Sequence, residues 1–409
     1  MRILMIANYL PYPQNSGGRI RIYNLLRRVA SKHEVSLAAF LESPEDAEGL
    51  SHLRQICAQV ETTSFQQRSR LSKIPGLLSF ALQGKPPELM LLHSEELVSK
   101  IRQLAATTKF DIVQIESVMG LYLDALPKTG HLKSIEMFQN ITSQQYERVS
   151  SVEQHWPKKL RMWLNSVAMG SWEPRYANKF DRCTTVSEAD RQLLLSANPN
   201  LTVDVIPNGV DLQKFRPLPP ENISTSLLFI GNLGYPPCSD AALYFCQEIF
   251  PHIQQQAETV EFWIVGRDPL PEVRALNSQF VHVTGAVEDV VPYYRQSAVC
   301  LVPLRAGGGT RLKILEAMAL GRPVVSTTIG CEGLEVIAGE HLLIADTPKQ
   351  FAEQTLRLLR DRQLAQALAA NGRRLVETRY GWDQIAEKLA GIYAELAVSS
   401  ETIGKGGLR

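Results

Sequence analysis

The chain has 409 residues, 43 of them basic and 42 acidic, and 44% of its residues are hydrophobic. That length favours two domains, because a single core stops growing beyond roughly 250–300 residues. The balanced charge argues against nucleic acid as a partner, and neither a secretory signal nor a bilayer-spanning run of about 18 apolar residues is expected. The six cysteines are scattered without paired spacing, so no metal site is expected and the protein is expected to be cytoplasmic.

Six short apolar runs in the first half read as buried strands, each followed by a helical pattern. They are RILMIAN (2–8), HEVSLAAF (33–40), FDIVQIE (110–116), KSIEMF (133–138), CTTVS (183–187) and VDVIPN (203–208). Alternation of strand and helix predicts a parallel sheet covered by helices on both faces. This pattern predicts an α/β domain over residues 1–207.

The first strand is followed by Gly17 and Gly18, which precede a helix. Glycines at such a place let the backbone approach a phosphate closely, although a structural turn is the alternative reading. The loop matches neither a P-loop nor GxGxxG. Glu116, Gln139 and Asn140 stand at later strand ends, where residues of a binding cleft are expected, and an ordinary polar strand end is the alternative for Glu116.

Two basic and aromatic segments in the first half are candidates for contact with a membrane surface. They are QQRSRLSKIPGLLSFALQGKPP (66–87) and HWPKKLRMWLNSVAMGSW (155–172). Arg and Lys mixed with Leu, Phe and Trp suit the interface of an anionic bilayer. The alternative is a loop and helix that cover the first core, so peripheral attachment to the cytoplasmic membrane face stays open.

The strand pattern restarts near Ser226, after a proline-rich stretch (207–222) that reads as an exposed linker. Strands are predicted at LLFIGN (227–232), EFWIVG (261–266), VHVTG (281–285), VCLVPL (299–304) and PVVSTT (323–328). A second domain is therefore expected over 208–379. Residues 380–409 are expected to form a terminal helix that packs back on the first domain, with a disordered tail from Ser399.

The most informative stretch is VPLRAGGGTRLKILEAMALGRPVVST (302–327). Gly307, Gly308 and Gly309 follow a strand, and a helix is predicted from Thr310 to Gly321. Free amides at that helix start suit a diphosphate, and Arg311 and Lys313 add cations for phosphate oxygens. Glu316 could accept hydrogen bonds from sugar hydroxyls. A glycine-rich turn before a surface helix is the alternative.

This stretch resembles the donor signature of the retaining glycosyltransferase family 4. The order of elements agrees over nearly the whole chain, including Asn208-Gly209-Val210-Asp211 and the late Tyr380-Gly381-Trp382. The resemblance implies the GT-B fold, two Rossmann-like domains facing each other across a cleft. It implies a nucleoside diphosphate sugar as co-substrate, with no other cofactor, and transfer to a sugar, lipid-linked or small-molecule acceptor in cell-surface polysaccharide or glycolipid assembly.

The resemblance also assigns site residues. Catalysis is expected from Arg311, Lys313 and Glu316. The donor is expected at Gly17, Gly18, Gly231, Asn232, Arg267, Gly285, Val287, Gly307, Gly308, Gly309 and Thr310. Arg19, Glu116, Gln139 and Asn140 are expected on the acceptor side.

Three departures from the family pattern keep other functions open. Gly308 replaces the first of two glutamates, Gln139 replaces a histidine, and FIGNLGYPPCSDAA (229–242) lacks the usual Arg and Lys. We expect Arg311 and Lys313 to supply that phosphate charge, and Gln139 to bind without exchanging protons. The alternatives are a non-catalytic nucleotide-sugar-binding or scaffold protein and a GT-B nucleotide-sugar epimerase, for which no acid–base residues stand out.

Overall fold

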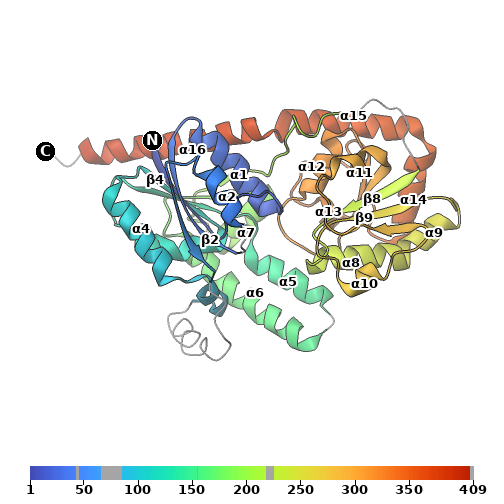
Figure 1. Ribbon diagram of the computed structural model, residues 1–409, viewed down its shortest axis with the longest axis horizontal. Helices are drawn as coiled ribbons and strands as arrows, with labels where there is room; N and C mark the ends of the chain where they lie inside the picture. The colour runs from blue at the N-terminus through green and yellow to red at the C-terminus, as the bar shows by residue number, and fades with distance from the viewer. Residues whose placement is uncertain (43–45, 66–84, 154, 218–224, 406–409) are drawn as a thin grey trace. The chain divides into compact units, whose positions relative to one another are not determined.

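The computed structural model describes residues 1–42, 46–65, 85–153, 155–217 and 225–405 (Figure 1). Contacts divide the chain into two compact units. The first comprises Met1–Glu147, Leu160–Pro207 and Asp383–Arg409, and the second comprises Arg148–Lys159 and Asn208–Trp382. The sequence predicts domain boundaries at 207/208 and 379/380. The contacts change unit at 207/208 and 382/383, and they also group 148–159 with the second unit.

The first unit is built on a parallel sheet with strand order β3-β2-β1-β4-β5-β6-β7. Its strands are β1 (Arg2–Ala7), β2 (Glu34–Leu41), β3 (Gln59–Ser64), β4 (Ile112–Glu116), β5 (Lys133–Met137), β6 (Arg182–Thr185) and β7 (Val203–Val205). All of these strands pair in parallel, and β1 and β4 are almost wholly buried. These strands are continuous apolar runs because both faces of a parallel sheet are covered, so that successive side chains are buried on either face.

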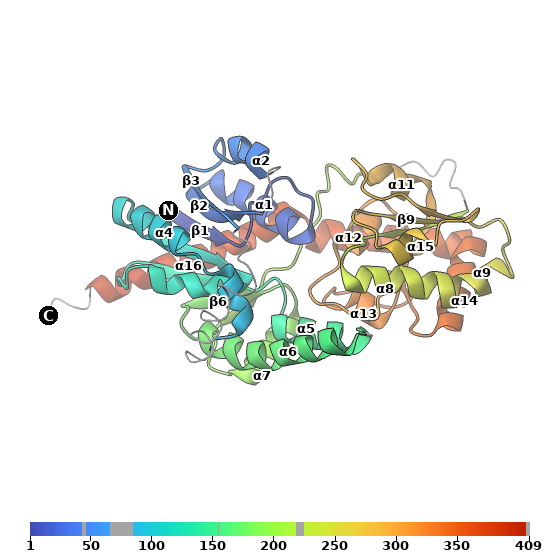
Figure 2. The same ribbon diagram turned by 60° about the horizontal axis from the view of Figure 1, so that its bottom comes forward.

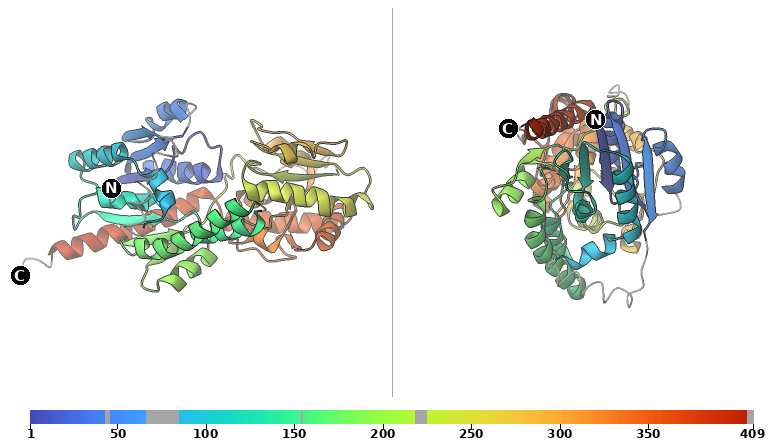
Figure 3. Two further views of the ribbon diagram at one scale, coloured as in Figure 1. Left: turned by 90° about the horizontal axis from the view of Figure 1, so that it is seen from below. Right: turned by 90° about the vertical axis from the view of Figure 1, so that its left-hand side faces the viewer.

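Helices cover this sheet on both faces (Figure 3). They are α1 (Gly17–Ala30), α2 (Asp46–Leu53), η2 (Pro87–Leu92), α4 (Glu95–Thr107), η3 (Ser117–Ala125), α5 (Thr142–Val152), α6 (Trp156–Ala177), α7 (Glu188–Ala197) and α16 (Trp382–Lys405). The terminal helix α16 packs on this unit, where the Tyr393 hydroxyl donates to Oε1 of Gln114 on β4. Two further contacts of α16 are ion pairs with Arg28 and Arg182.

The second unit again has a sheet packed against helices (Figure 2). Its strand order is β10-β9-β8-β11-β12-β13. Its strands are β8 (Ser226–Ile230), β9 (Phe262–Val265), β10 (Val281–Val283), β11 (Ser297–Val302), β12 (Val324–Ser326) and β13 (Leu343–Ile344). Its helices are α8 (Pro236–Tyr244), η4 (Phe245–Ile249), α9 (Phe250–Gln254), α10 (Pro271–Arg274), α11 (Val291–Gln296), α12 (Leu312–Ala319), α13 (Thr328–Cys331), α14 (Pro348–Arg360) and α15 (Arg362–Arg379). The structure therefore confirms the prediction of two Rossmann-like domains, each built on a parallel sheet.

Two strands were missing from the sequence prediction. The β3 strand is QVETTS at the edge of its sheet, where only Val60 and Thr63 are buried, so it lacks the apolar run of a central strand. The β13 strand has two residues, too few to leave a pattern. Both strands form because a neighbouring strand offers free backbone groups, and that information lies outside the segment itself.

The structure corrects two other expectations. The stretch expected to be an exposed linker packs into the second core over its first half: Val210 and Phe215 are buried, and the Val210 amide donates to the Tyr380 carbonyl. The tail expected to be disordered from Ser399 continues as α16 to Lys405.

A buried carboxyl group in the first unit predicts an unusual dependence of stability on pH. Glu136 on β5 is 1% exposed, and its Oε2 has no hydrogen-bond partner among the described residues. Burial, reinforced by the nearby charge of Glu173, raises the pKa of Glu136 well above its usual value. As pH rises past the ordinary glutamate pKa, the unfolded chain loses this proton before the folded protein does. The free energy of unfolding therefore falls through the window between the two pKa values.

We expect Glu136→Gln to flatten this fall, because glutamine stays neutral in both states. Urea unfolding midpoints measured from pH 4 to pH 8 check it. The exposed Glu34, which begins β2, provides a matched Glu→Gln control that should leave the slope unchanged. A slope that is the same in wild type and Glu136→Gln would contradict the prediction.

Candidate functional site

In each sheet the strand order reverses beside the first strand of the unit. Strand β1 lies between β2 and β4, and β8 lies between β9 and β11. In open parallel sheets, ligands bind beyond the carboxyl ends of the strands at such a reversal. The glycines after β1 and Glu116 at the end of β4 stand at the first reversal. Gly231 after β8 and the three glycines after β11 stand at the second.

The glycine loop joins β11 to α12 and depends on backbone conformations that other residues rarely adopt. Gly307 has φ 124° and Gly309 has φ 66°, both in the region that favours glycine. The next residue, Thr310, is buried, and its hydroxyl accepts a hydrogen bond from the Asn208 amide at 2.7 Å. The helix α12 begins at Leu312, two residues later than Thr310, and Gly321 follows its end with φ 69°.

Arg311, which directly precedes α12, forms hydrogen bonds to the backbone of the glycine loop. It is 7% exposed, and its guanidinium donates to the carbonyls of Gly308 and Gly309 and to that of Ile329. Burial lowers its pKa from the usual arginine value, and no ion pair of Arg311 with a carboxylate is found among the described residues. The side chain therefore places a positive charge at the loop while binding two of the loop's carbonyls and one carbonyl of α13.

Lys313 brings a second cation to the end of β8. Its ammonium lies 3.8 Å from Sγ of Cys238 and 4.3 Å from the centre of the Phe229 ring. A Cβ placed on Gly231 would come within 3.1 Å of this nitrogen. Across the described part of the chain, no carboxylate lies within ion-pair distance of Lys313, and desolvation lowers its pKa. Lys313 is thus a sheltered cation that lacks an anionic partner among the described residues.

Glu316 lies one turn further along α12 than Lys313. Its Oε2 accepts a hydrogen bond from the Tyr294 hydroxyl at 3.0 Å. Desolvation raises its pKa, whereas the hydrogen bond from Tyr294 and the charges of Lys214 and Lys313 oppose that rise. The two side chains Lys313 and Glu316 therefore interact through their charges, and their atoms form no hydrogen bond.

The ends of β8, β9 and β10 meet at the same edge of this sheet. A Cβ on Gly266 would lie 1.7 Å from the carbonyl oxygen of Gly231, and the Gly266 amide donates to the Gly285 carbonyl at 3.1 Å. Asn232 uses its Oδ1 to accept from the Gly234 amide. Arg267 pairs with the adjacent Asp268 at 3.7 Å, so its charge is partly satisfied, and Val287 packs against the second core.

The structure adds a residue to this site that the sequence analysis missed. Arg148, grouped with the second unit, donates to the Gly307 carbonyl at 3.1 Å and forms a two-pronged ion pair with Glu332. Arg148 lies on α5, far from the loop in sequence, and no local motif surrounds it. Only the tertiary structure could place this third cation at the glycine loop.

In the first unit, the segment between β1 and α1 brings the backbone of Gly18 close to the Tyr9 hydroxyl. Ser16 caps α1, and a Cβ on Gly18 would lie 1.8 Å from the Tyr9 hydroxyl and 2.8 Å from Oε1 of Gln139. Glycine is therefore needed at position 18 for close approach, and Gly17 begins the helix beside it. Burial raises the pKa of Tyr9, so its phenol stays neutral at physiological pH.

Glu116 is the centre of a buried hydrogen-bond network. It accepts from Nε2 of Gln114 at 2.7 Å and from Nε2 of Gln139 at 3.1 Å. Burial raises its pKa, and the charge of Arg21 opposes the rise. The structure therefore brings Gly18, Glu116 and Gln139 together. Asn140 points elsewhere, with its amide donating to Gln145 at 2.7 Å.

Arg19 is held by two carboxylates of its own unit. Its guanidinium lies 2.6 Å from Oδ1 of Asp46 and 2.8 Å from Oε2 of Glu42. Asp46 is 1% exposed and Arg19 is 5% exposed. The Arg19 side chain thus neutralises a buried carboxylate near Gly17 and Gly18. Its hydrogen bonds go to Asp46 and Glu42, and it takes no part in the network of Glu116 and Gln139.

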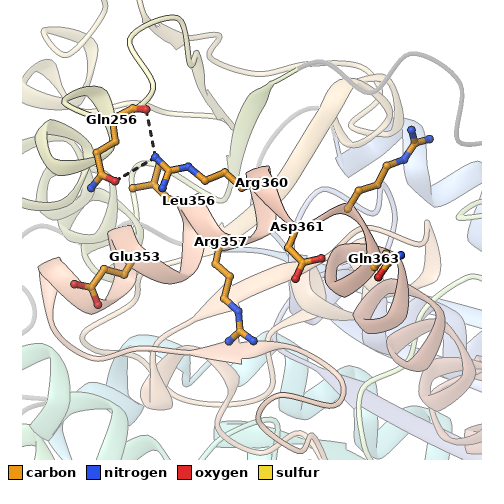
Figure 4. Close-up of a pocket in the computed structure, with 8 residues that line it drawn as sticks. Gln256, Glu353, Leu356, Arg357, Arg360, Asp361 and Gln363 are labelled. Carbon is orange, nitrogen blue, oxygen red and sulfur yellow. Dashed lines mark hydrogen bonds between the residues drawn. The ribbon is translucent and has the colours of Figure 1, made fainter.

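A surface hollow elsewhere in the second unit contains none of the predicted site residues. It is lined by Gln256, Glu353, Leu356, Arg357, Arg360, Asp361, Arg362 and Gln363 (Figure 4). Arg360 donates to Gln256, whereas Arg357 and Asp361 point in other directions (Figure 4). The charged side chains of this hollow do not point toward a common centre where a ligand could bind. The glycine loop therefore remains the candidate site.

The described residues contain no group of three or more His, Cys, Asp or Glu side chains arranged to hold a metal ion. They also contain no helix with the length and apolar character to cross a membrane. The first of the two candidate membrane segments, 66–87, lies mostly outside the described residues.

Comparison with known families and proteins gives a consistent result. Residues 15–214 match the model "Glycosyltransferase Family 4", and residues 224–361 match the model "Glycosyl transferases group 1". A 44.6 kDa protein in the cps region of Klebsiella pneumoniae is 22% identical over 394 residues, which is 93% of this chain and 96% of the relative. A phosphatidyl-myo-inositol mannosyltransferase of Mycobacterium leprae is 25% identical over 249 residues, covering 58% of this chain and 65% of the relative.

Solved structures share the fold. The crystal structure of Anabaena HepE in complex with UDP and glucose has a TM-score of 0.67 and 16% identity, covering 97% of this chain and all of that one (100%). The crystal structure of TarM has a TM-score of 0.70 and 12% identity, covering 96% of this chain and 98% of TarM. The fold and the family matches therefore agree: the chain forms two Rossmann-like units with glycines where the strand order reverses, and the family models match most of its length. The chain belongs to the GT-B glycosyltransferases of family 4, the glycosyl transferases of group 1.

Proposed function

We propose that this glycosyltransferase moves a sugar from a nucleoside diphosphate sugar to an acceptor hydroxyl, with retention of the anomeric configuration and without a metal ion. The donor diphosphate binds at the glycine loop 307–309 and the first turn of α12. The nucleotide base contacts the backbone around Gly285 and Val287, and Glu316 accepts hydrogen bonds from sugar or ribose hydroxyls. The acceptor binds beside Glu116 and Gln139.

The observation that carries this proposal is the sheltered ammonium of Lys313. It lies beside Gly231 at the reversal of strand order, with no carboxylate in ion-pair distance among the described residues. A partly buried cation without a counter-charge is unfavourable, and an anionic ligand at that place removes the cost. The glycine amides and the start of α12 favour the same kind of ligand.

The chemistry of transfer fits this arrangement. As the glycosidic bond breaks, the leaving diphosphate gains negative charge, and fixed cations and amides stabilise the transition state more than the ground state. Arg311 donates to the carbonyls of Gly308 and Gly309, and Arg148 donates to that of Gly307, so the loop amides are oriented before the donor arrives. With Gln139 in place of a proton-exchanging residue, same-face attack assisted by the donor phosphate is the mechanism that we propose for retention.

The biological setting that we propose is cell-surface polysaccharide or glycolipid assembly, with the enzyme peripheral on the cytoplasmic membrane face. The Klebsiella relative belongs to a cps region, and the Mycobacterium relative is named a phosphatidyl-myo-inositol mannosyltransferase. These names support a sugar or lipid-linked acceptor.

A thermal-melt series with UDP, GDP, ADP and their common sugars tests donor binding. A nucleotide at 100 times its dissociation constant should stabilise the protein by about 2.7 kcal/mol. We expect one base to raise the melting temperature by several degrees and the shift to disappear in Lys313→Met. Lys349→Met, an exposed lysine on α14, is the matched control. Equal shifts in wild type and Lys313→Met would contradict the proposed donor site.

Product analysis with the preferred donor separates transfer from its alternatives. Transfer or donor hydrolysis in the presence of a chelator supports a metal-independent transferase, and the anomeric configuration of the product tests retention. Binding without turnover would favour a scaffold protein. Conversion of the nucleotide sugar to its epimer, independent of any acceptor, would favour an epimerase.

A further inference from the structure

Helix α6 carries an apolar stripe that faces solvent. Its exposed large side chains recur at the spacing of one helical face: Trp156 (73% exposed), Leu160 (47%), Trp163 (52%), Leu164 (53%) and Val167 (56%). At 1.5 Å per residue the stripe is about 16 Å long. A contiguous apolar surface of this kind on a helix marks an interaction site rather than scattered surface residues.

The opposite face of α6 already has its packing partner. Met169, Trp172, Tyr176 and Ala177 are buried in the core of the first unit, and the Trp172 and Tyr176 rings stack at 4.6 Å. With 3.6 residues per turn, these residues lie about half a turn away from the exposed stripe. The stripe is therefore not needed for the packing of the helix, which carries apolar side chains on two opposite faces.

The charges beside the stripe all have the same sign. Lys158, Lys159 and Arg161 are exposed, and residues 155–172 contain no aspartate or glutamate. No ion pair neutralises these three cations in the described part of the chain. A protein partner would favour a mixture of charges at the rim, whereas a uniformly basic rim around tryptophan and leucine complements an anionic lipid surface.

We infer that the exposed face of α6 docks the enzyme on an anionic lipid bilayer. The helix lies in the plane of the interface, with the two tryptophans at the headgroup level and Leu160, Leu164 and Val167 in the acyl boundary. Lys158, Lys159 and Arg161 contact lipid phosphates. This deepens the proposed function by naming the surface that brings the enzyme to a membrane-bound acceptor, and only that consequence rests on the proposed function.

Vesicle co-sedimentation of the full chain tests the inference. Wild-type protein is mixed with vesicles of phosphatidylcholine alone and with vesicles that also contain phosphatidylglycerol. We expect binding to the anionic vesicles and weakening of that binding by salt. Replacing Lys158, Lys159 and Arg161 together with glutamine should weaken it about 100-fold, since each charge near the surface contributes about a factor of five.

Trp163→Ala/Leu164→Ala should weaken binding at least about tenfold, because the exposed side chains lose their burial in lipid. Ile337→Ala in the second unit, 55% exposed, is the matched apolar control and should bind as wild type does. A melting temperature unchanged from wild type shows that each variant is folded.

Three results would overturn the inference. One is no binding of wild type to anionic vesicles, and another is binding that the α6 variants leave unchanged. The third is self-association in solution that Trp163→Ala/Leu164→Ala abolishes while vesicle binding stays absent, which would assign the stripe to a second copy of the chain. Because the assay needs no turnover, loss of sugar transfer to a water-soluble acceptor would count against the proposed function and leave this inference standing.

Discussion

Lys313→Met is expected to lower kcat/KM for sugar transfer by about 100-fold or more. Methionine keeps much of the volume beside Phe229 and Cys238 but removes the charge that faces the proposed diphosphate. Loss of one preorganised contact to charge that develops in a transition state typically raises the barrier by about 3 kcal/mol. Steady-state kinetics with the donor identified by thermal melts measure the effect.

The pattern of kcat and KM distinguishes a role in catalysis from one in binding. If Lys313 contacts the leaving diphosphate, kcat should fall at least as much as donor affinity does. Lys349→Met controls for loss of a lysine at an exposed place. Cys238→Ala removes the hydrogen-bond partner of Lys313 and keeps its charge, so it should retain most activity. If Lys313→Met changes kcat/KM by twofold or less, other groups than Lys313 stabilise the charge of the diphosphate.

Arg21→Met is expected to destabilise the protein by about 3–5 kcal/mol, the largest effect on stability that we expect from one substitution. Arg21 is 1% exposed and donates to the carbonyls of Ile206 and Pro207, each at 2.8 Å. Burial lowers its pKa to about 10, a shift that the charge of Glu116 opposes. Its removal leaves two carbonyls and a buried carboxylate without their cation. The midpoint of urea unfolding measures the loss.

A double-mutant cycle tests whether the charge of Glu116 is the reason. Arg21→Met/Glu116→Gln has neither buried charge, so it should recover a substantial part of the loss seen in Arg21→Met. Arg28→Met, which breaks a solvent-exposed pair with Asp383, is the control and should change stability by less than about 1 kcal/mol. An Arg21→Met protein within about 1 kcal/mol of wild type would contradict this account.

Much of the architecture was predictable because the evidence for it is local. The central strands are apolar runs of four to eight residues, a pattern typical of parallel sheets buried on both faces. The edge strand β3 and the two-residue β13 escaped prediction, since their formation depends on the strand beside them. The stretch 208–217 has the composition of a linker, but the second core buries Val210 and Phe215 from it.

The candidate site divides in the same way. The glycine loop and the spacing of Arg311, Lys313 and Glu316 are local, so the sequence predicts them, and close approach explains the glycine at position 18. The sequence does not show that Arg311 turns back onto the loop carbonyls. Nor does it indicate that Arg19 is held by Asp46 and Glu42.

By itself, the sequence determined the two Rossmann-like domains, the family and the segment that carries the glycine loop, because hydrophobic periodicity and helix signals act over a few residues. Only the tertiary structure decided which charges are paired. Arg148 reaches Gly307 and Glu332 across more than 150 positions of the chain. Lys313 is left without a carboxylate among the described residues. Pairing depends on where the fold places distant side chains and how far it shields them from water, and no local pattern records either.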